Sequence, residues 1–469
     1  MKKHTFYLVI TLFLIICNSS FAQCFTSIST RYNHNVGIKP DGSIYCWGWG
    51  NWGQLNNGTE LDEYVPIPLT SVINWQSIKA SHFSTFVIKN DGTLWGCGGN
   101  LYGTLGIGST APNASVMTQV GTASNWKEIA PADSFTIALK TDNSLWGWGQ
   151  NDGYQMGNNT CCSNQLTPIQ IGTSTDWRTI ATSNVESAFA IKNNGTLWCW
   201  GSNLAALLGD SSVSTRNVPV QHNPDTDWDK ITLGIAQILA LKTNNSLWAW
   251  GGGQYGETGH LPSSSFNSSA PFQIAGSWKA VGAGLFFSMG IKTDGTLWAW
   301  GRNNTGQLGD GTTTNRHIPV QLGTATNWDS VECGYLHTIA LRTDGSLWAW
   351  GSNDFGQMGN GTTTAIATPA NIPIAGCSLD TATFEAVVNT VQVSPNPVKN
   401  ELTLRYQGNE QVDTIVLYDV LGKEVYRIQA MGNLSFVSSF NIGELRSGTY
   451  IVVLKNNDKN VVKTQVIKE

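Results

Sequence analysis

Charged side chains are scarce in this chain of 469 residues, because Asp, Glu, Lys and Arg make up only 13% of it. A typical soluble protein has about a quarter. The 27 basic and 32 acidic residues give a net charge of −5, which excludes the strongly basic footprint of a nucleic-acid-binding protein and a polybasic membrane patch. With 20 Trp and 41% hydrophobic residues, the chain also lacks the composition of a disordered protein.

Long apolar runs are absent as well. The apolar segment at residues 6–17 follows Lys2 and Lys3 and precedes small or polar residues that end at Ala22. About 12 apolar residues cannot cross a bilayer core of about 30 Å, whereas a charged start, a short apolar segment and small residues are typical of a secretory signal. We therefore predict a signal peptide at residues 1–22, export of the protein, and no transmembrane segment.

Catalytic and cofactor motifs are also missing. The sequence has no His-Glu-x-x-His, no calcium-binding loop, no Gly-x-Ser-x-Gly and no glycine-rich phosphate loop between a strand and a helix. The glycine-rich residues 252–256 are not followed by a helical pattern. We accordingly predict no catalytic residues, no metal site and no cofactor.

An internal repeat dominates the remaining sequence. A Leu-Trp pair or its equivalent recurs in steps of 50 to 52 residues, at Ile44-Tyr45, Leu94-Trp95, Leu145-Trp146, Leu197-Trp198, Leu247-Trp248, Leu297-Trp298 and Leu347-Trp348. A further aromatic residue lies 19 or 20 positions before each pair, at Phe25, Trp75, Trp126, Trp177, Trp228, Trp278 and Trp328. Positions that recur in all copies are expected to be structural, and function is expected at positions that differ.

Each copy contains a hairpin signal such as Asp294-Gly295 before the Leu-Trp pair. We interpret it as a two-residue turn, which makes the repeated Asp a turn former rather than a metal ligand. That turn places Trp298 opposite Ile291 and Trp300 opposite Met289, with small residues on the other face. A cation precedes each turn, as Lys292 does, and its stem is expected to lie over Trp with a solvated head.

Two more strands complete each copy. The upstream aromatic residue opens an alternating strand, and a Pro-containing segment typical of an edge strand closes the copy near Pro66, Pro168, Pro219, Pro319 and Pro369. Seven copies of four strands predict an all-β protein whose residues 23–376 form a seven-bladed β-propeller.

The repeats resemble the regulator of chromosome condensation (RCC-type) family, most clearly at residues 333–338, 344–348, 350–353 and 356–359. The resemblance implies a seven-bladed propeller that serves as a protein-interaction platform. The exchange-factor activity known in the family is not expected, because the copies carry no insertion and the chain is exported. Only His34 and His337 keep the histidine of the family signature, and we expect structural histidines that bond loop backbone rather than a metal or catalytic pair.

The composition changes near residue 385, since all Trp residues lie between 47 and 350. Residues 391–469 contain short strand patterns at 391–393, 402–405, 414–418, 425–428, 450–455 and 462–467, which predict a small β-sandwich of immunoglobulin-like type after a linker at 377–390. The segments 394–400, 417–425, 445–450 and 463–468 resemble the C-terminal sorting domain of bacterial type IX secretion. The resemblance implies delivery by the type IX machinery to the surface of a Gram-negative cell or into the medium.

Export permits disulfides. We predict a bond between Cys24 and Cys377, which flank the propeller, and buried thiols at Cys46 and Cys199. Cys161 and Cys162 could bond to each other or to nothing.

The predicted function is non-catalytic binding of an extracellular protein or glycan; the alternative is a hydrolase or lyase acting on extracellular polysaccharide. The loops between the first and second strands differ most between copies and supply the candidate ligand contacts Arg31, Tyr32, His34, His82, Phe83, Asp133, Glu186, Phe286, Tyr335 and His337. These side chains could instead plug the central channel. A rival patch comprises Trp49, Trp52, Tyr102, Tyr255 and Phe355.

Overall fold

The computed structural model describes residues 25–69, 74–184, 186–209, 215–260, 267–374, 390–407, 411–430, 435–457 and 459–469. The chain divides into two compact units, Met1–Leu379 and Asp380–Glu469, and each unit has hydrophobic core residues of its own. The predicted signal peptide and the predicted Cys24–Cys377 bond lie outside the described residues.

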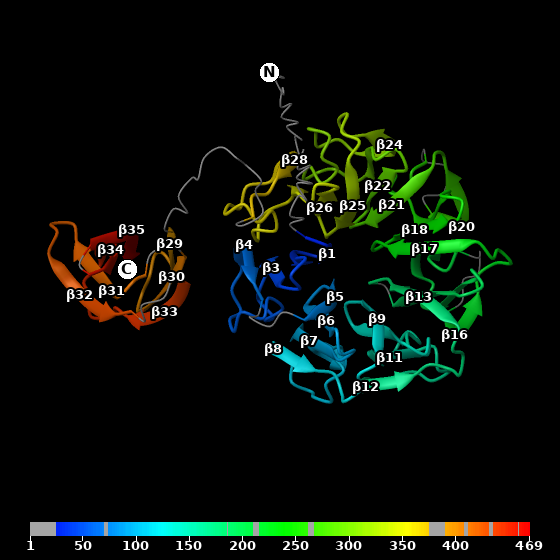
Figure 1. The fold of residues 1–469 in the computed structure, drawn as a ribbon, viewed down its shortest axis with the longest axis horizontal. Helices are drawn as coiled ribbons and strands as arrows, with labels where there is room; N and C mark the ends of the chain where they lie inside the picture. The colour runs from blue at the N-terminus through cyan, green and yellow to red at the C-terminus, as the bar shows by residue number, and fades with distance from the viewer. Residues whose placement is uncertain are drawn as a thin grey trace, which may run out of the picture. The chain divides into compact units, whose positions relative to one another are not determined.

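The first unit is a ring of seven four-stranded antiparallel sheets, each built from consecutive strands (Figure 1). The predicted seven-bladed propeller is therefore confirmed. Blades 1 to 4 consist of β1 (Ser27–Arg31), β2 (His34–Ile38), β3 (Ile44–Gly48) and β4 (Glu63–Pro68); β5 (Trp75–Ala80), β6 (Ser84–Lys89), β7 (Leu94–Gly99) and β8 (Asn113–Gln119); β9 (Trp126–Pro131), β10 (Phe135–Lys140), β11 (Leu145–Gly149) and β12 (Gln165–Gln170); and β13 (Trp177–Thr182), β14 (Ser187–Lys192), β15 (Leu197–Gly201) and β16 (Arg216–Gln221). Blades 5 to 7 consist of β17 (Trp228–Leu233), β18 (Gln237–Lys242), β19 (Leu247–Gly252) and β20 (Asn267–Ile274); β21 (Trp278–Ala283), β22 (Phe287–Lys292), β23 (Leu297–Gly301) and β24 (Arg316–Gln321); and β25 (Trp328–Cys333), β26 (His337–Arg342), β27 (Leu347–Gly351) and β28 (Ile366–Asn371). Two single-turn 3-10 helices, Leu101–Gly103 and Leu204–Ala206, interrupt the outer connections of blades 2 and 4.

The hairpin register differs from the sequence prediction by one residue. Trp298 lies opposite Gly290 and Trp300 opposite Ser288, whereas Ile291 pairs with Leu297. The turn is longer than predicted, because Lys292 N bonds Thr296 O at 2.9 Å and Gly295 adopts the left-handed conformation at φ 81°. A one-residue change of register moves side chains to the other face. The Trp residues therefore share a face with small residues, and the aliphatic residues occupy the opposite face.

The repeated Asp shapes this turn, as predicted. Asp294 Oδ1 accepts hydrogen bonds from the backbone N of Thr296 at 3.0 Å and from its hydroxyl at 2.6 Å. The Trp298 Nε1 group in turn donates to the Thr296 hydroxyl at 2.9 Å. The cation before the turn lies over the ring of the same Trp, since Lys292 Nζ is 3.5 Å from the centroid of the Trp298 ring. The ammonium itself therefore contacts the ring, whereas the sequence predicted the stem over Trp and the head in solvent.

Hydrogen bonds fasten each blade to the one before it. In blades 1, 3, 4, 5 and 6 the second Trp donates from Nε1 to a backbone carbonyl in the outer connection of the preceding blade, as Trp200 does to Gln155 O at 2.8 Å. The same bond closes the ring, because Trp47 of blade 1 donates to Gln357 O of blade 7 at 3.0 Å. In blade 7 the Nε1 of Trp350 is buried without a hydrogen-bond partner, and the Thr338 hydroxyl donates to Gln307 O of blade 6 at 3.0 Å. In blade 2 the smaller Cys97 replaces this Trp and directs its thiol to Gln54 O.

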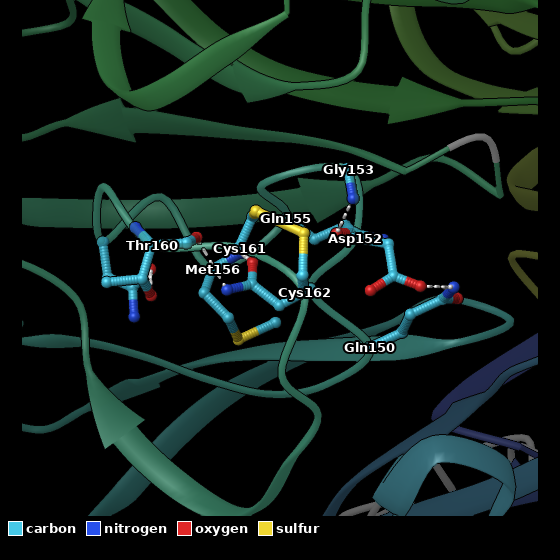
Figure 2. The surroundings of a disulfide bond; sticks show 10 residues. Gln150, Asp152, Gly153, Gln155, Met156, Thr160, Cys161 and Cys162 are labelled. Carbon is cyan, nitrogen blue, oxygen red and sulfur yellow. Dashed lines mark hydrogen bonds between the residues drawn. A yellow bond between two sulfur atoms is a disulfide. The ribbon is translucent and has the colours of Figure 1, made fainter.

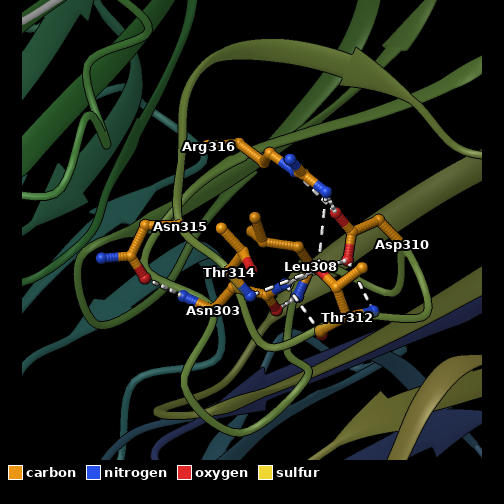
Figure 3. A network of polar contacts seen from close by, with 7 residues as sticks. All are labelled: Asn303, Leu308, Asp310, Thr312, Thr314, Asn315 and Arg316. Atoms are coloured by element: carbon orange, nitrogen blue, oxygen red, sulfur yellow. Dashed lines mark hydrogen bonds and ion pairs between the residues drawn. The ribbon is translucent and has the colours of Figure 1, made fainter.

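A side-chain network holds the outer connections in shape (Figure 3). In blade 6, Asn303 Nδ2 donates to Asp310 Oδ1 at 3.0 Å, while Asn303 Oδ1 accepts from the Leu308 N–H at 3.0 Å. The Arg316 guanidinium then donates to Asp310 Oδ2 at 2.7 Å. The connection between β23 and β24 is thus internally hydrogen-bonded, so the residues on its outer side are presented in a fixed arrangement.

The second unit is a sandwich of two sheets, ordered β29-β30-β33 and β32-β31-β34-β35, which confirms a C-terminal β domain. Its strands are β29 (Thr390–Ser394), β30 (Glu401–Gln407), β31 (Thr414–Asp419), β32 (Glu424–Gln429), β33 (Ser435–Asn441), β34 (Gly448–Asn456) and β35 (Lys459–Lys468). The sequence analysis missed β33, because three serines among its seven residues weaken the apolar alternation. Leu404 of the first sheet and Leu417 and Val452 of the second belong to a single core between the sheets.

Candidate ligand-binding face

The two loop sets that the sequence analysis treated as rivals lie on the same face of the propeller. In an antiparallel meander, alternate connections lie at the same end of the strands. The connection between the first and second strands therefore lies on the same side of the ring as the connection between the third and fourth strands. We call this side of the ring the loop face. The ring centroids of Tyr32, from the first set, and Trp49, from the second, are 6.0 Å apart.

Aromatic residues from blades 7, 1 and 2 form one continuous cluster on the loop face. Tyr32 stacks on His82 with ring centroids 3.3 Å apart, His82 stacks on Phe83 at 3.7 Å, and Tyr335 lies 4.3 Å from Tyr32. The outer connections extend the cluster, since Trp52 lies 5.2 Å from Phe83, and Trp49 lies 6.0 Å from Phe355. We call these half-buried residues the aromatic surface: Tyr32, Trp49, Trp52, His82, Phe83, Tyr335 and Phe355.

Asp133 holds the central histidine of the aromatic surface. His82 Nδ1 and Asp133 Oδ2 are 2.9 Å apart, and the other carboxylate oxygen of Asp133 is buried without a hydrogen-bond partner. Among the described residues, no hydroxyl or thiol is hydrogen-bonded to His82. The pair therefore fixes the orientation of the ring between Tyr32 and Phe83.

Arg31 does not belong to the aromatic surface. Its guanidinium reaches across the axis from blade 1 to blade 4, where Nε donates to Asn184 Oδ1 at 3.1 Å and Nη2 donates to Thr182 O at 3.1 Å. Burial lowers the pKa of Arg31, although Asp133 and Glu332 oppose that shift. Arg31 thus obstructs the end of the channel, as the alternative interpretation of these loops proposed.

The channel below Arg31 holds charges that the sequence analysis did not single out. A cavity of about 350 Å³ is lined by the first strands of the blades and contains Lys79, Glu128, Lys230 and Glu332. Burial raises the pKa of Glu128 and of Glu332, and Glu128 accepts a hydrogen bond from the Thr179 hydroxyl at 2.7 Å. Because alternate residues of a strand face one side, comparing every second position of the seven first strands would have revealed these charges.

The two family-like histidines lie in the core rather than on the loop face. His34 Nε2 is 3.0 Å from the Thr85 hydroxyl of blade 2, and His337 Nε2 is 2.8 Å from Asn35 Oδ1 of blade 1. They bond side chains of the next blade, not loop backbone as predicted. Burial lowers the pKa of each to about 3, so both are neutral. Among the described residues, no cluster of three or more His, Cys, Asp or Glu side chains is arranged to hold a metal ion.

The remaining candidates lie apart from the aromatic surface. Tyr255 and Phe286 form a separate pair with centroids 5.3 Å apart, and Arg302 lies 5.5 Å from the Tyr255 ring. Tyr102 is 48% exposed within the first 3-10 turn. Glu186 fills the space beside Gly153, because a Cβ added to Gly153 would lie 2.5 Å from Glu186 Oε2.

A vicinal disulfide lies in the outer connection of blade 3 (Figure 2). Cys161 and Cys162 are bonded to each other, which resolves the alternative that the sequence left open. Asn151 supports this loop, because its Nδ2 donates to Thr160 O at 2.9 Å. Cys46, Cys97, Cys199 and Cys333 are buried free thiols, and burial raises the pKa of Cys199 to about 12.

Comparison with known families identifies both units. The model described as "Regulator of chromosome condensation (RCC1) repeat" matches residues 41–88, 142–184, 294–341 and 344–382, and a second model with that description matches 278–307 and 328–357. The model of a "Secretion system C-terminal sorting domain" matches residues 392–468. The chain carries RCC1 repeats and a secretion sorting domain. The sorting domain implies interaction with the type IX secretion machinery, and secretion or attachment at the cell surface.

Curated proteins match part of the chain. The ultraviolet-B receptor UVR8 of Arabidopsis thaliana is 26% identical over 198 residues, which are 41% of this chain and 44% of the receptor. The human E3 ubiquitin-protein ligase HERC2 is 26% identical over 138 residues, 28% of this chain and 3% of the ligase. The match spans less than half the length of these relatives.

Solved structures share the fold. Prp20p of Saccharomyces cerevisiae superimposes with a TM-score of 0.64 and 18% identity, covering 76% of this chain and 89% of Prp20p. Human WBSCR16 gives a TM-score of 0.60 and 17% identity, covering 68% of this chain and 87% of that protein. In the described part of the RCC1 propeller and sorting domain, no helix is long and apolar enough to span a membrane.

Proposed function

We propose that the RCC1 propeller binds an extracellular protein or glycan without catalysis, through the aromatic surface on its loop face. The observation that carries the proposal is the merging of two loop sets into one cluster that includes Tyr32, Trp49, Trp52, His82 and Phe83. Aromatic side chains bury a large area at low conformational cost and are enriched among the residues that dominate binding energy.

The fixed arrangement of these rings supports binding rather than a purely structural role. His82 is held by Asp133, and Trp52 N donates to Gln54 Oε1 at 2.9 Å, so the rings are positioned before a ligand arrives. Preorganised side chains lose little freedom on binding. A packing role would repeat the same residue in every blade, whereas the residues at these positions vary from blade to blade.

The test measures ligand capture by the full mature chain. Surface proteins and glycans from the producing bacterium are presented separately to the wild type and to a Trp52→Ala, Phe83→Ala double variant. We expect affinity to fall at least tenfold, or about 1.4 kcal/mol. A Tyr102→Ala, Tyr255→Ala variant serves as the matched control, since these aromatic residues lie outside the aromatic surface.

Loss of binding in the control variant alone would move the site to the surroundings of Tyr102 and Tyr255. Equal binding by all three proteins would contradict a role for aromatic residues on this face. Capture from the protein fraction or from the glycan fraction decides the class of ligand.

Delivery of the propeller is proposed to depend on residues 391–469. Deleting them is expected to leave folded propeller in the periplasm, because the sorting signal is lost while the propeller has its own core. Surface immunodetection and limited proteolysis of the periplasmic fraction test this expectation. Normal surface display of the truncated chain would refute it.

A further inference from the structure

Two adjacent apolar residues protrude from the sorting domain. Val420 and Leu421, in the connection between β31 and β32, are 69% and 91% exposed. Isolated exposed apolar residues are common on protein surfaces, but neighbouring ones are typical of contact sites. The pair therefore requires a partner to explain it.

The turn that presents these residues is internally fixed. Asp419 Oδ1 accepts hydrogen bonds from the backbone N of Leu421 and of Lys423, each at 2.9 Å. The Gly422 N–H bonds Asp419 O at 3.0 Å, and Gly422 has φ 83°, a conformation that favours glycine. Leu421 consequently projects from a defined turn and does not fold back onto the domain core.

A groove of about 320 Å³ continues the apolar surface beside this turn. Its lining includes Val420 together with Tyr418, Ile451, Val453 and Lys455. Ile451 is 37% exposed, and Lys455 Nζ lies 5.5 Å from the centroid of the Tyr418 ring. The surface thus combines protruding aliphatic residues with a neighbouring groove whose lining includes both Asp419 and Lys455.

We propose that the β31–β32 turn and this groove are the surface by which the type IX secretion machinery recognises the chain. The partner surface that fits is an apolar pocket for Leu421. The sorting-domain match names the machinery as the partner of this unit. The inference rests on the proposed role of residues 391–469 in delivery, and it assigns that role to a defined surface.

The experiment follows export of the full chain in a bacterium with type IX secretion. The variants are Leu421→Asp and Leu421→Ser, which remove the apolar contact at a side chain with almost no intramolecular packing. Val437→Asp on β33 is the matched control, because Val437 is also exposed, at 47%, but lies on the other sheet of the sandwich. Protease accessibility on intact cells measures surface delivery, and urea unfolding of the purified chains measures folding.

We expect both Leu421 variants to reduce surface delivery at least tenfold and to accumulate as folded protein in the periplasm, with Leu421→Met and Val437→Asp near wild type. Wild-type export of both Leu421 variants would overturn the docking surface. Equal loss in Val437→Asp would also overturn it, since the effect would not be specific to the turn. If deletion of residues 391–469 leaves export normal, the proposed delivery role itself fails, which is a separable result.

Discussion

The substitution Arg31→Met tests whether Arg31 stabilises the propeller or binds the ligand. The substitution removes the hydrogen bonds to Asn184 Oδ1 and Thr182 O that join blade 1 to blade 4 across the channel. Hydrogen bonds to charged groups contribute about 1.5–3 kcal/mol, and removing a partner leaves buried acceptors unsatisfied. The variant no longer has to bury a charged guanidinium, and this gain offsets part of the loss. We therefore expect the free energy of unfolding to decrease by about 2 kcal/mol.

Equilibrium unfolding in urea measures this decrease as a lower midpoint with an unchanged slope. Arg302→Met is the control, because Arg302 contributes a cation–π contact to Tyr255 worth about 0.5–1 kcal/mol. Ligand capture by Arg31→Met is expected to match the wild type at temperatures where both are folded. Unchanged stability combined with lost capture would refute the assignment of Arg31 to the channel and return it to the binding surface.

Three further predictions concern His337, the pair of Lys292 and Trp298, and the vicinal disulfide. Stability should fall as pH drops below 6.5, because the unfolded chain protonates His337 at that pH while the buried ring does so only near pH 3, and by pH 4 the loss due to His337 is about 3 kcal/mol. His34, whose pKa is also lowered to about 3, adds a loss of its own, so His337→Gln should make the profile of urea midpoints against pH less steep, and an unchanged profile would contradict the role of His337. A double-mutant cycle of Lys292→Met with Trp298→Leu should give a coupling of about 0.5–1 kcal/mol, whereas zero coupling would mean that the ammonium does not stabilise the ring. Alkylation of the native protein should modify Cys161 and Cys162 only after reduction, and modification without a reductant, detected by mass spectrometry, would exclude the vicinal bond.

Much of the fold could be predicted because the repeat supplies an internal comparison. Seven recurrences of the Leu-Trp pair and of the upstream aromatic residue determine seven blades, and the recurring Pro marks the edge strand. The role of Asp294 as a turn former also follows from sequence, since Asp-Gly in a hairpin has a local physical meaning. Buried thiols at Cys46 and Cys199 were predictable because each replaces a small packing residue in the repeat.

The register of the hairpin was decided by backbone geometry that the sequence does not specify uniquely. Asp-Gly is compatible with a two-residue turn and with a longer turn that ends in a left-handed Gly, and the two differ by one residue in pairing. In the folded sheet, Gly290 and not Ile291 lies opposite Trp298. A local signal thus identified the turn, whereas its length is established only by the pairing in the folded sheet.

The residues of the aromatic surface were likewise predicted in part from the sequence, and their contacts were decided by the tertiary structure. Sequence alone determined which loops vary and that they carry aromatic residues, so Tyr32, Phe83 and Trp52 were all candidates. Only closure of the ring decided that blade 7 meets blade 1, which places Tyr335 beside Tyr32 although more than 300 residues separate them. The same closure brought Asn184 within reach of Arg31 and so assigned that side chain to the channel. Contacts between residues so distant in sequence depend on how seven sheets share one axis, a geometric condition that no local pattern contains.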